Sequence, residues 1–245
     1  MIKTMYNEIG YCLIRKLINP DLIKVIKSEY DDPIRCGNRN LDYSENVINA
    51  GAIILNIISE IVNGNSCYKL AWITLFDKNS DSNWRVPMHI DEMAPILNES
   101  LAKINNVTEI CIKENHLYGK LLRSQLKSTI SARLSIDDSN TDKGPLLVIP
   151  GSHCSESQMD SKNAIEVLAK SGDVIVMSPL LLHSSEKLIS DVRRRVLHFN
   201  YVEIEYCGFI GNQKITAQQA DAPDRISPVI IATTPSRKIT VESVL

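Results

Sequence analysis

The feature that most constrains the fold is a change of hydrophobic pattern at Tyr68. From there to about Val202, short apolar runs alternate with clusters of Asp, Asn, Ser and Gly, which is the pattern of an all-β unit. The turn clusters at 137–144 and 171–173 are the clearest examples. We therefore predict strands at 68–76, 131–136, 146–149, 174–177 and 196–202.

The segment before Tyr68 has helical spacing. A short strand is expected at 11–18, and Asn19 followed by Pro20 is typical of an N-cap with proline in the first turn. A first helix should bury one face, made by Leu22, Ile23, Ile26 and Tyr30. A second helix is predicted at about 44–62, ended by Asn63-Gly64. Its buried side is predicted to carry Ile48, Ala52, Leu55, Ile58 and Val62.

The length of 245 residues fits one domain, since a single barrel or sandwich can occupy this length. We predict one domain over 1–245, with a β core at about 68–205 and a helical N-terminal layer at about 19–63. The stretch 93–128 has no clear period, and long excursions of this kind often form lids or substrate-binding loops. The tail after about residue 213 is polar and weakly patterned.

Composition excludes several classes of protein. With 44% hydrophobic and 23% charged residues, the chain is expected to be globular, and a net charge of −2 gives no reason to expect nucleic acid or an anionic membrane as partner. No apolar window approaches the roughly 20 residues that span a bilayer, and charges interrupt the first apolar stretch. We expect a soluble, cytoplasmic protein that acts on a small molecule. The oligomeric state stays unknown.

The six cysteines do not indicate a metal or disulfide framework, because they are scattered without a Cys-x-x-Cys pair. A different set of residues suggests a metal site. His89 and Asp91 form a His-x-Asp triplet, and alternate residues of a strand point to the same face, so both side chains could bind one ion. The triplet alone is a weak signal, because a surface histidine beside an acid is common. Trp84 is expected to pack near this strand.

His183 is the candidate for a third ligand, because it ends the apolar run that follows Gly172-Asp173. Two imidazoles and one carboxylate on one face of an octahedral metal leave three positions open, which is the arrangement of non-haem Fe(II) oxygenases. A zinc hydrolase can use the same ligand types, but its His-Glu-x-x-His helix motif is absent from the sequence.

Arg194 is the candidate cation for a cosubstrate. 2-Oxoglutarate chelates a metal through its keto-acid end and leaves a second carboxylate, which a guanidinium can bind through two hydrogen bonds. Arg194 follows His183 by enough residues for a turn and a returning strand. If Arg194 faces inward, so do Val196, His198 and Asn200, with His198 either a core histidine or a group behind the metal ligands. The opposite register remains open at this stage.

In combination, these residues resemble the phytanoyl-CoA dioxygenase family of Fe(II)/2-oxoglutarate oxygenases. The resemblance runs in the family's order over most of residues 8–202. It is carried by Glu8-Ile9-Gly10-Tyr11, Phe76-Asp77-Lys78, the segment from Asn83 to Asp91, Asp137-Asp138, the segment from Gly144 to His153, and Gly172-Asp173 through His183 to Arg194.

The resemblance implies a mainly β fold, a double-stranded β-helix (a cupin-like jelly roll) with N-terminal helices packed on one sheet. It implies that His89, Asp91 and His183 bind iron and that Arg194 and Ser185 hold the distal carboxylate of 2-oxoglutarate. Arg133 matches a position that faces the cosubstrate or the substrate. Lys78 matches an Asp-Lys pair of small family members. It could contact the cosubstrate, lie behind the site or be a surface charge.

The implied activity is that of a dioxygenase using Fe(II), 2-oxoglutarate and O₂, most directly a hydroxylase of a small metabolite or natural-product intermediate. The chain departs from the family at Met88 and Ile90 and in the segment after the His-x-Asp triplet, which leaves the substrate open. Asp91 disfavours halogenation, because related halogenases replace this carboxylate with a small residue. Desaturation, cyclisation and epimerisation remain alternatives, as does a cupin-like isomerase or binding module without O₂ activation.

Overall fold

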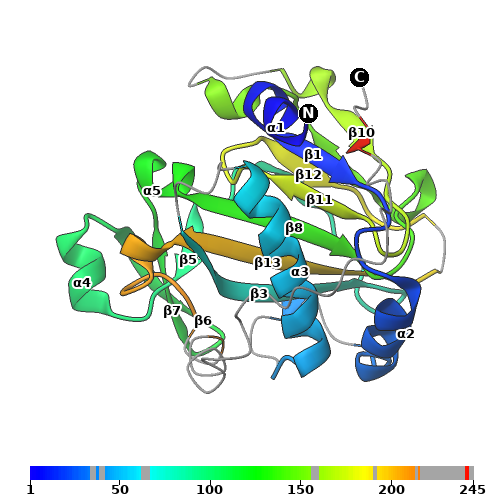
Figure 1. Cartoon of the computed structure of the whole chain (residues 1–245), viewed down its shortest axis with the longest axis horizontal. Helices are drawn as coiled ribbons and strands as arrows, with labels where there is room; N and C mark the ends of the chain where they lie inside the picture. The colour runs from blue at the N-terminus through cyan, green and yellow to red at the C-terminus, as the bar shows by residue number, and fades with distance from the viewer. Residues whose placement is uncertain are drawn as a thin grey trace.

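The computed structural model describes residues 1–33, 37–38, 42–61, 67–155, 160–189, 192–212, 215 and 241–242. Within them, two antiparallel sheets face each other and helices cover the outer side of the larger one (Figure 1). The larger sheet has the order β14-β1-β11-β8-β13-β3-β2, formed by Val241–Glu242, Tyr11–Ile14, Val174–Met177, Thr129–Ser135, Arg194–Glu203, Tyr68–Lys78 and Gly37–Asn38. The smaller sheet has the order β10-β9-β12-β4, formed by Ile165–Val167, Leu146–Val148, His183–Ser185 and Val86–His89.

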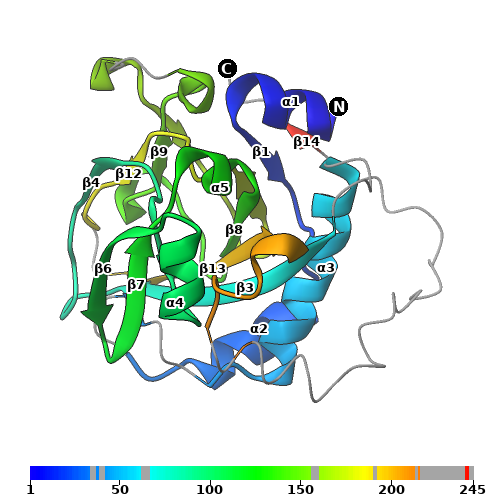
Figure 2. The ribbon, with the colours of Figure 1, turned by 90° about the vertical axis from the view of Figure 1, so that its left-hand side faces the viewer.

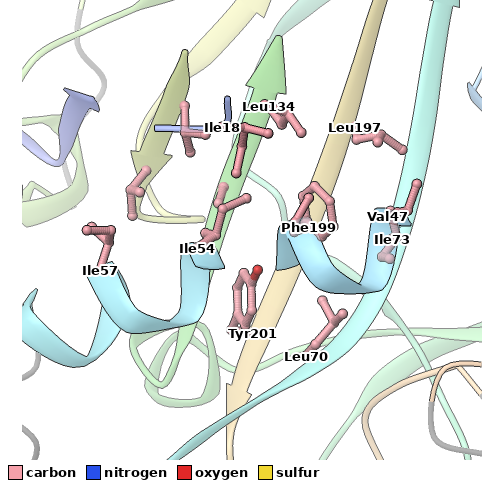
Figure 3. Packing of buried hydrophobic residues seen from close by; sticks show 14 of the residues in the cluster. Ile18, Val47, Ile54, Ile57, Leu70, Ile73, Leu134, Leu197, Phe199 and Tyr201 are labelled. Atoms are coloured by element: carbon pink, nitrogen blue, oxygen red, sulfur yellow. The ribbon is translucent and has the colours of Figure 1, made fainter. Parts of the chain in front are cut away.

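Three helices lie near the N-terminus: α1 (Ile2–Ile9), α2 (Pro20–Glu29) and α3 (Glu45–Ile61). The predicted cap of α2 is confirmed, because the Asn19 side chain accepts a hydrogen bond of 2.8 Å from the backbone N–H of Leu22. The helices and the outer face of the large sheet share one apolar core, in which Ile54 and Ile57 of α3 lie on the side of the helix that faces the sheet (Figure 3). Complete burial of one such aliphatic side chain contributes about 1.5–3 kcal/mol.

The predicted buried face of the second helix is wrong. Val62 lies outside the described residues, and of the other four expected residues only Ile58 is buried. The face against the sheet is made by Val47, Ala50, Gly51, Ile54, Ile57, Ile58 and Ile61. Gly51 explains the difference, because a Cβ there would lie only 3.2 Å from Leu70 and 3.3 Å from Phe199. The helix turns its small residues toward the sheet, while Ile48 and Leu55 stay partly exposed.

A second apolar cluster fills the space between the two sheets, at the end where β1 and β11 face β9 and β10. Figure 2 shows the small sheet on one side of the large sheet and α2 and α3 on the other. Since opposite residues of antiparallel strands share a face, the pairing Arg194↔Lys78 and His198↔Arg133 puts these four side chains on one face of the large sheet. That face looks toward the small sheet.

The excursion 93–128 has secondary structure of its own. It contains a sheet of order β5-β7-β6 (Met93–Pro95, His116–Lys120 and Thr108–Lys113) with α4 (Glu99–Ile104) and α5 (Arg123–Lys127). An apolar cluster attaches it to the main body through Ala71 of β3 and Val202 of β13. Its role as a lid or substrate-binding segment stays a prediction.

The longer strands expected from the sequence are confirmed, within a few residues, by β3, β8, β9, β11 and β13. The first strand stops at Ile14 rather than residue 18, because Lys16 has a φ of 52° and its N–H donates to Asp173. Short 3₁₀ turns lie at Thr141–Lys143, Ser152–Cys154, Ser161–Asn163 and Ile204–Tyr206. Asn63-Gly64 and most of the tail lie outside the described residues. No helix among the described residues is long and apolar enough to cross a membrane.

Candidate active site

His89, Asp91 and His183 lie together, although His183 is far from the other two in sequence. β12 pairs with β4 so that His183 is opposite His89. The strand ends at His89, and Asp91 is positioned by its own N–H, which donates to the Pro179 carbonyl at 2.9 Å. One potential ligand atom from each of the three side chains lies within 4.8 Å of the others.

Backbone carbonyls orient both imidazoles. The Nδ1 atom of His89 lies 2.8 Å from the Pro87 carbonyl oxygen, and that of His183 lies 2.9 Å from the Leu181 carbonyl oxygen. A carbonyl can only accept, so Nδ1 carries the proton and Nε2 keeps a free lone pair. The two Nε2 atoms lie 3.5 Å and 3.7 Å from Oδ1 of Asp91. These are the donor atoms that a divalent metal needs.

The electrostatics of Asp91 and His183 favour the protonation states of metal ligands, whereas the pKa of His89 is raised, because its burial is outweighed by its hydrogen bond to Asp91 and by the charge of Asp91. Burial by itself raises the pKa of Asp91, but the neighbouring imidazoles, chiefly those of His183 and His89, outweigh it and hold that pKa well below its usual range. Burial lowers the pKa of His183. The cluster therefore contains an ionised, partly exposed carboxylate beside a buried, neutral His183, the states in which both groups bind metals.

His198 is a third imidazole beside Asp91. It lies on β13, is buried, and its Nε2 is 3.6 Å from Oδ2 of Asp91, an oxygen with no hydrogen-bond partner among the described residues. The ring of Phe76 packs edge-on against it, with 5.9 Å between ring centroids. Burial lowers the pKa of His198 to about 4. Of the two roles that the sequence left open, the structure favours the one behind the metal ligands.

A cavity of about 320 Å³ opens next to the three potential ligands. Its walls include Phe76, Trp84 and Leu146, so that aromatic and aliphatic surface surrounds the polar groups. The expected position of Trp84 near β4 is confirmed. Phe76 was not predicted as part of the site, and His198 was predicted as part of it only in one of two alternatives. Both residues can be found from the period of two along β3 and β13. Phe76 precedes Lys78 by two residues and His198 follows Arg194 by four, so each shares a face with an expected site residue.

Two cations form the end of the cavity that lies away from the three potential metal ligands. Arg194 and Lys78 face each other across β13 and β3 and are only 2% and 1% exposed. Lys78 Nζ donates to Oγ of Ser185 at 3.0 Å and also to the Glu186 carbonyl. Nε and Nη1 of Arg194 have no hydrogen-bond partner among the described residues. The inward register of Arg194 is thus confirmed, and a surface position for Lys78 is wrong.

Burial and mutual repulsion weaken the protonation of these cations. The pKa of Lys78 falls to about 7, first by burial and then by the charges of Arg194 and Arg133. Burial and the charge of Arg133 lower the pKa of Arg194 to about 9. Buried charges of one sign without partners are costly, and an anion placed between them would remove that cost.

Arg133 and Arg85 complete the charged lining. Arg133, on β8, is 8% exposed, and its guanidinium lies 5.9 Å from the centre of the Phe76 ring. Arg85 lies at the rim and forms an exposed ion pair of 3.1 Å with Glu186. All seven residues expected at the site line one cavity, namely Lys78, His89, Asp91, Arg133, His183, Ser185 and Arg194.

Comparison with known proteins gives a family and a fold. The model of the family "Phytanoyl-CoA dioxygenase (PhyH)" matches residues 113–196, which include His183, Ser185 and Arg194 but not His89 or Asp91. No curated protein sequence matches the chain.

Several solved structures share the fold. HygX from Streptomyces hygroscopicus, solved with nickel, 2-oxoglutarate and hygromycin B, has a TM-score of 0.59 at 15% identity, covering 83% of this chain and 86% of that one. SnoN, a non-haem α-ketoglutarate-dependent epimerase from nogalamycin biosynthesis, has a TM-score of 0.62 at 12% identity, with coverages of 82% and 79%. AviO1 from Streptomyces viridochromogenes Tue57 has a TM-score of 0.58 at 16% identity, with coverages of 83% and 94%.

At these identities the likeness shows the fold alone, which is the mainly β jelly roll that the sequence predicts. Together with the family match, it confirms that the chain resembles the phytanoyl-CoA dioxygenase family of iron- and 2-oxoglutarate-dependent oxygenases.

Proposed function

We propose that this chain is an Fe(II)/2-oxoglutarate-dependent dioxygenase that oxidises a C–H bond of a small molecule. One observation carries the proposal. Two imidazole Nε2 atoms and one carboxylate converge at one end of a cavity whose other end contains a buried guanidinium with unpaired N–H groups. A metal and a diacid are the ligands that satisfy both ends at once.

The donor set fits a ferrous ion. His89, Asp91 and His183 would supply two neutral nitrogens and one oxygen, and a metal bound to them would compensate the buried charge of Asp91. Both imidazoles are fixed through Nδ1, so they need little reorganisation when the ion binds. When bound, Fe(II) with 2-oxoglutarate and O₂ supplies an oxidant strong enough for an unactivated C–H bond, with succinate and CO₂ as coproducts.

The far end of the cavity fits the distal carboxylate of 2-oxoglutarate. Arg194 offers two unpartnered N–H groups, and Ser185 and Lys78 offer further donors on the same side. HygX and SnoN have been crystallised with 2-oxoglutarate or α-ketoglutarate and have the same fold. Phe76 and Trp84 would exclude water from the cosubstrate, which strengthens its ion pair with Arg194.

Hydroxylation is the most direct outcome for such a site, and we propose it as the reaction. The same residues could serve desaturation, cyclisation or epimerisation of a differently placed substrate, and SnoN, an epimerase, has this fold. Halogenation is disfavoured, because the carboxylate of Asp91 would occupy the metal position that a halogenase leaves open for halide. An isomerase or binding module that never uses O₂ would have no need for Arg194.

The reaction class is tested by succinate formation from 2-oxoglutarate, with Fe(II), O₂ and a broad panel of small metabolites and natural-product intermediates. We expect at least one compound to stimulate succinate release in proportion to its own oxidation. Complete lack of iron- and substrate-dependent turnover across the panel would count against the proposal.

The cosubstrate site is tested by calorimetric binding of 2-oxoglutarate to nickel-loaded protein. Arg194→Ala should lose most of the 2-oxoglutarate affinity and keep its nickel affinity. Arg195→Ala is the matched control, because Arg195 is the next residue on β13 but points to the opposite face, where it binds Asp137 at 2.8 Å. Equal 2-oxoglutarate affinities in the wild type and Arg194→Ala would remove the role of Arg194.

A further inference from the structure

The cavity contains more positive charge than the proposed metal and cosubstrate require. Its charged lining consists of Lys78, Arg85, Asp91, Arg133 and Arg194. Arg85 is balanced by Glu186 at the rim. Lys78, Arg133 and Arg194 remain, all more than nine-tenths buried, against the single carboxylate of Asp91.

Binding of Fe(II) and 2-oxoglutarate does not remove this excess. The two charges of the ion are offset by Asp91 and by the carboxylate of 2-oxoglutarate that chelates the metal. The distal carboxylate offsets one cation, which the geometry assigns to Arg194. Of the two cations that remain, Lys78 lies beside Arg194 at the end that would hold the distal carboxylate, and it donates to Ser185 and the Glu186 carbonyl. Arg133 is then the cation left without a counter-charge.

The backbone of Arg133 is level with the metal site, and the charge of Asp91 acts on its guanidinium. On the large sheet it is paired with His198, whose Nε2 is 3.6 Å from Asp91. Arg194 precedes His198 by four residues on β13, a backbone separation of about 13 Å at the usual rise of a strand. Arg133 makes no side-chain hydrogen bond among the described residues; it lies over the Phe76 ring, and burial lowers its pKa while the charge of Asp91 acts in the opposite direction.

We propose that the substrate carries an anionic group, such as a carboxylate or a phosphate or sulfate ester, and that Arg133 binds it beside the metal. The proposal rests on the proposed function and narrows its substrate class. An anion at this position would be held by a planar guanidinium that the Phe76 ring already orients, so that a neighbouring C–H bond of the substrate is placed near the metal. The surplus charge would also attract anions into the cavity before they bind.

The test uses the full chain loaded with Zn(II), which is redox-inactive, and saturated with 2-oxoglutarate. A panel of small carboxylic acids, each matched with its primary amide, is screened by saturation-transfer NMR, and the best pair is measured by calorimetry. We expect the acids to bind in clear preference to the amides. Arg133→Gln should abolish that preference, with a loss of at least about 30-fold in acid affinity, since removing one partner of a buried hydrogen-bonded charge pair has effects of this size or larger.

Two variants make the result specific. Arg133→Lys retains a cation and should restore part of the preference for acids, and Arg133→Gln should keep its 2-oxoglutarate affinity within about threefold of the wild type. Equal binding of acids and amides by the wild type would overturn the proposal. So would a 2-oxoglutarate affinity that falls in Arg133→Gln as much as the acid affinity, because Arg133 would then belong to the cosubstrate. Wild-type protein that binds no 2-oxoglutarate at all would instead contradict the proposed function.

Discussion

Three imidazoles surround the carboxylate of Asp91, and they do so in two different ways. His89 and His183 present Nε2 toward Oδ1, whereas His198 approaches Oδ2 from the large sheet. An N–H from His198 would hold the second oxygen away from the ion and keep the carboxylate as a single ligand. Groups that orient metal ligands in this way contribute strongly to metal affinity.

We therefore expect His198→Leu to weaken nickel binding by about 10- to 100-fold, because it removes the donor beside Oδ2 while filling similar space. His198→Gln keeps a donor and should bind nickel more tightly than His198→Leu. Calorimetric titration of both proteins with Ni(II) measures the difference, and circular dichroism checks that both are folded. Wild-type affinity in His198→Leu would show that His198 is only a core residue.

Lys78 gives the cosubstrate affinity a defined pH dependence. Its pKa in the free protein is about 7, lowered by burial and by Arg194 and Arg133. A bound carboxylate favours the ammonium form, so that binding above pH 7 must take up a proton. The affinity for 2-oxoglutarate should then fall from pH 7 to pH 9, by up to about tenfold per pH unit. Below pH 7 the amine is already protonated and the affinity should level off.

The measurement is 2-oxoglutarate binding to nickel-loaded protein across this range. In Lys78→Met the affinity should be weaker at pH 7 and nearly flat between pH 7 and pH 8, a range that lies below the pKa of about 9 of Arg194. Lys69→Ala, which removes an exposed cation of the same strand, should behave as the wild type. A wild-type affinity that stays constant from pH 7 to pH 9 would contradict the assigned role of Lys78.

At the scale of elements, the turn at Gly144, before β9, shapes the end of the cavity that contains Lys78 and Arg194. Gly144 has a φ of 55°, and a Cβ added there would lie 2.2 Å from the Glu186 carbonyl oxygen. That carbonyl accepts a hydrogen bond from Lys78. The close approach of the two segments therefore requires glycine and fixes where Lys78 and Ser185 lie.

Gly144→Ala should both destabilise the protein, by about 1–3 kcal/mol, and weaken 2-oxoglutarate binding, because the strained backbone and the clash displace the Glu186 segment. Gly208→Ala is the control, since a Cβ there meets only Leu101, at 3.9 Å. Urea denaturation gives the free energy of unfolding, and calorimetry gives the affinity. If both alanine variants are equally stable and bind equally well, the turn does not constrain the site.

β13 shows how much an element can reveal in sequence. Its alternation predicted that Arg194 and His198 share one face, which is confirmed, and the structure places Arg195 and Phe199 on the other face. The small-sheet strands around His89 and His183 were harder to predict, because β4 and β12 have only four and three residues. Segments this short carry too few residues for a period.

The helix α3 shows what the sequence of an element cannot predict, namely which of its faces is buried. It is apolar on most sides, so that several faces could be buried equally well by hydrophobicity alone. The choice between them depends on the shape of the sheet, where Leu70 and Phe199 approach the backbone at Gly51. That information is absent from the helix sequence itself.

At the scale of the whole molecule, the metal ligands connect distant parts of the chain. His89 and His183 belong to neighbouring strands of the small sheet, and Asp91 contacts Pro179 and His198, which ties it to both sheets. A metal bound there would link these segments. A ligand that binds only the folded state stabilises it by mass action.

Saturation with Ni(II) at about 100 times its dissociation constant should raise the free energy of unfolding by about 2.7 kcal/mol, and a chelator should reverse the effect. His183→Ala should lose this dependence on metal. Thermal unfolding with and without Ni(II) measures both. An unfolding temperature that Ni(II) leaves unchanged in the wild type would show that the three residues do not form a metal site.

The sequence by itself determined the succession of helices and strands, the residue types of a metal site and the alternation that puts Arg194 and His198 on one face. These properties are local, because a few neighbouring residues define a period, a cap or a motif. The tertiary structure decided which strand His89 pairs with, which face α3 buries, that His198 lies against Asp91, and that Lys78 and Arg133 share one cavity with Arg194. Those relations join residues far apart in the chain, and only the packing of the two sheets brings them together.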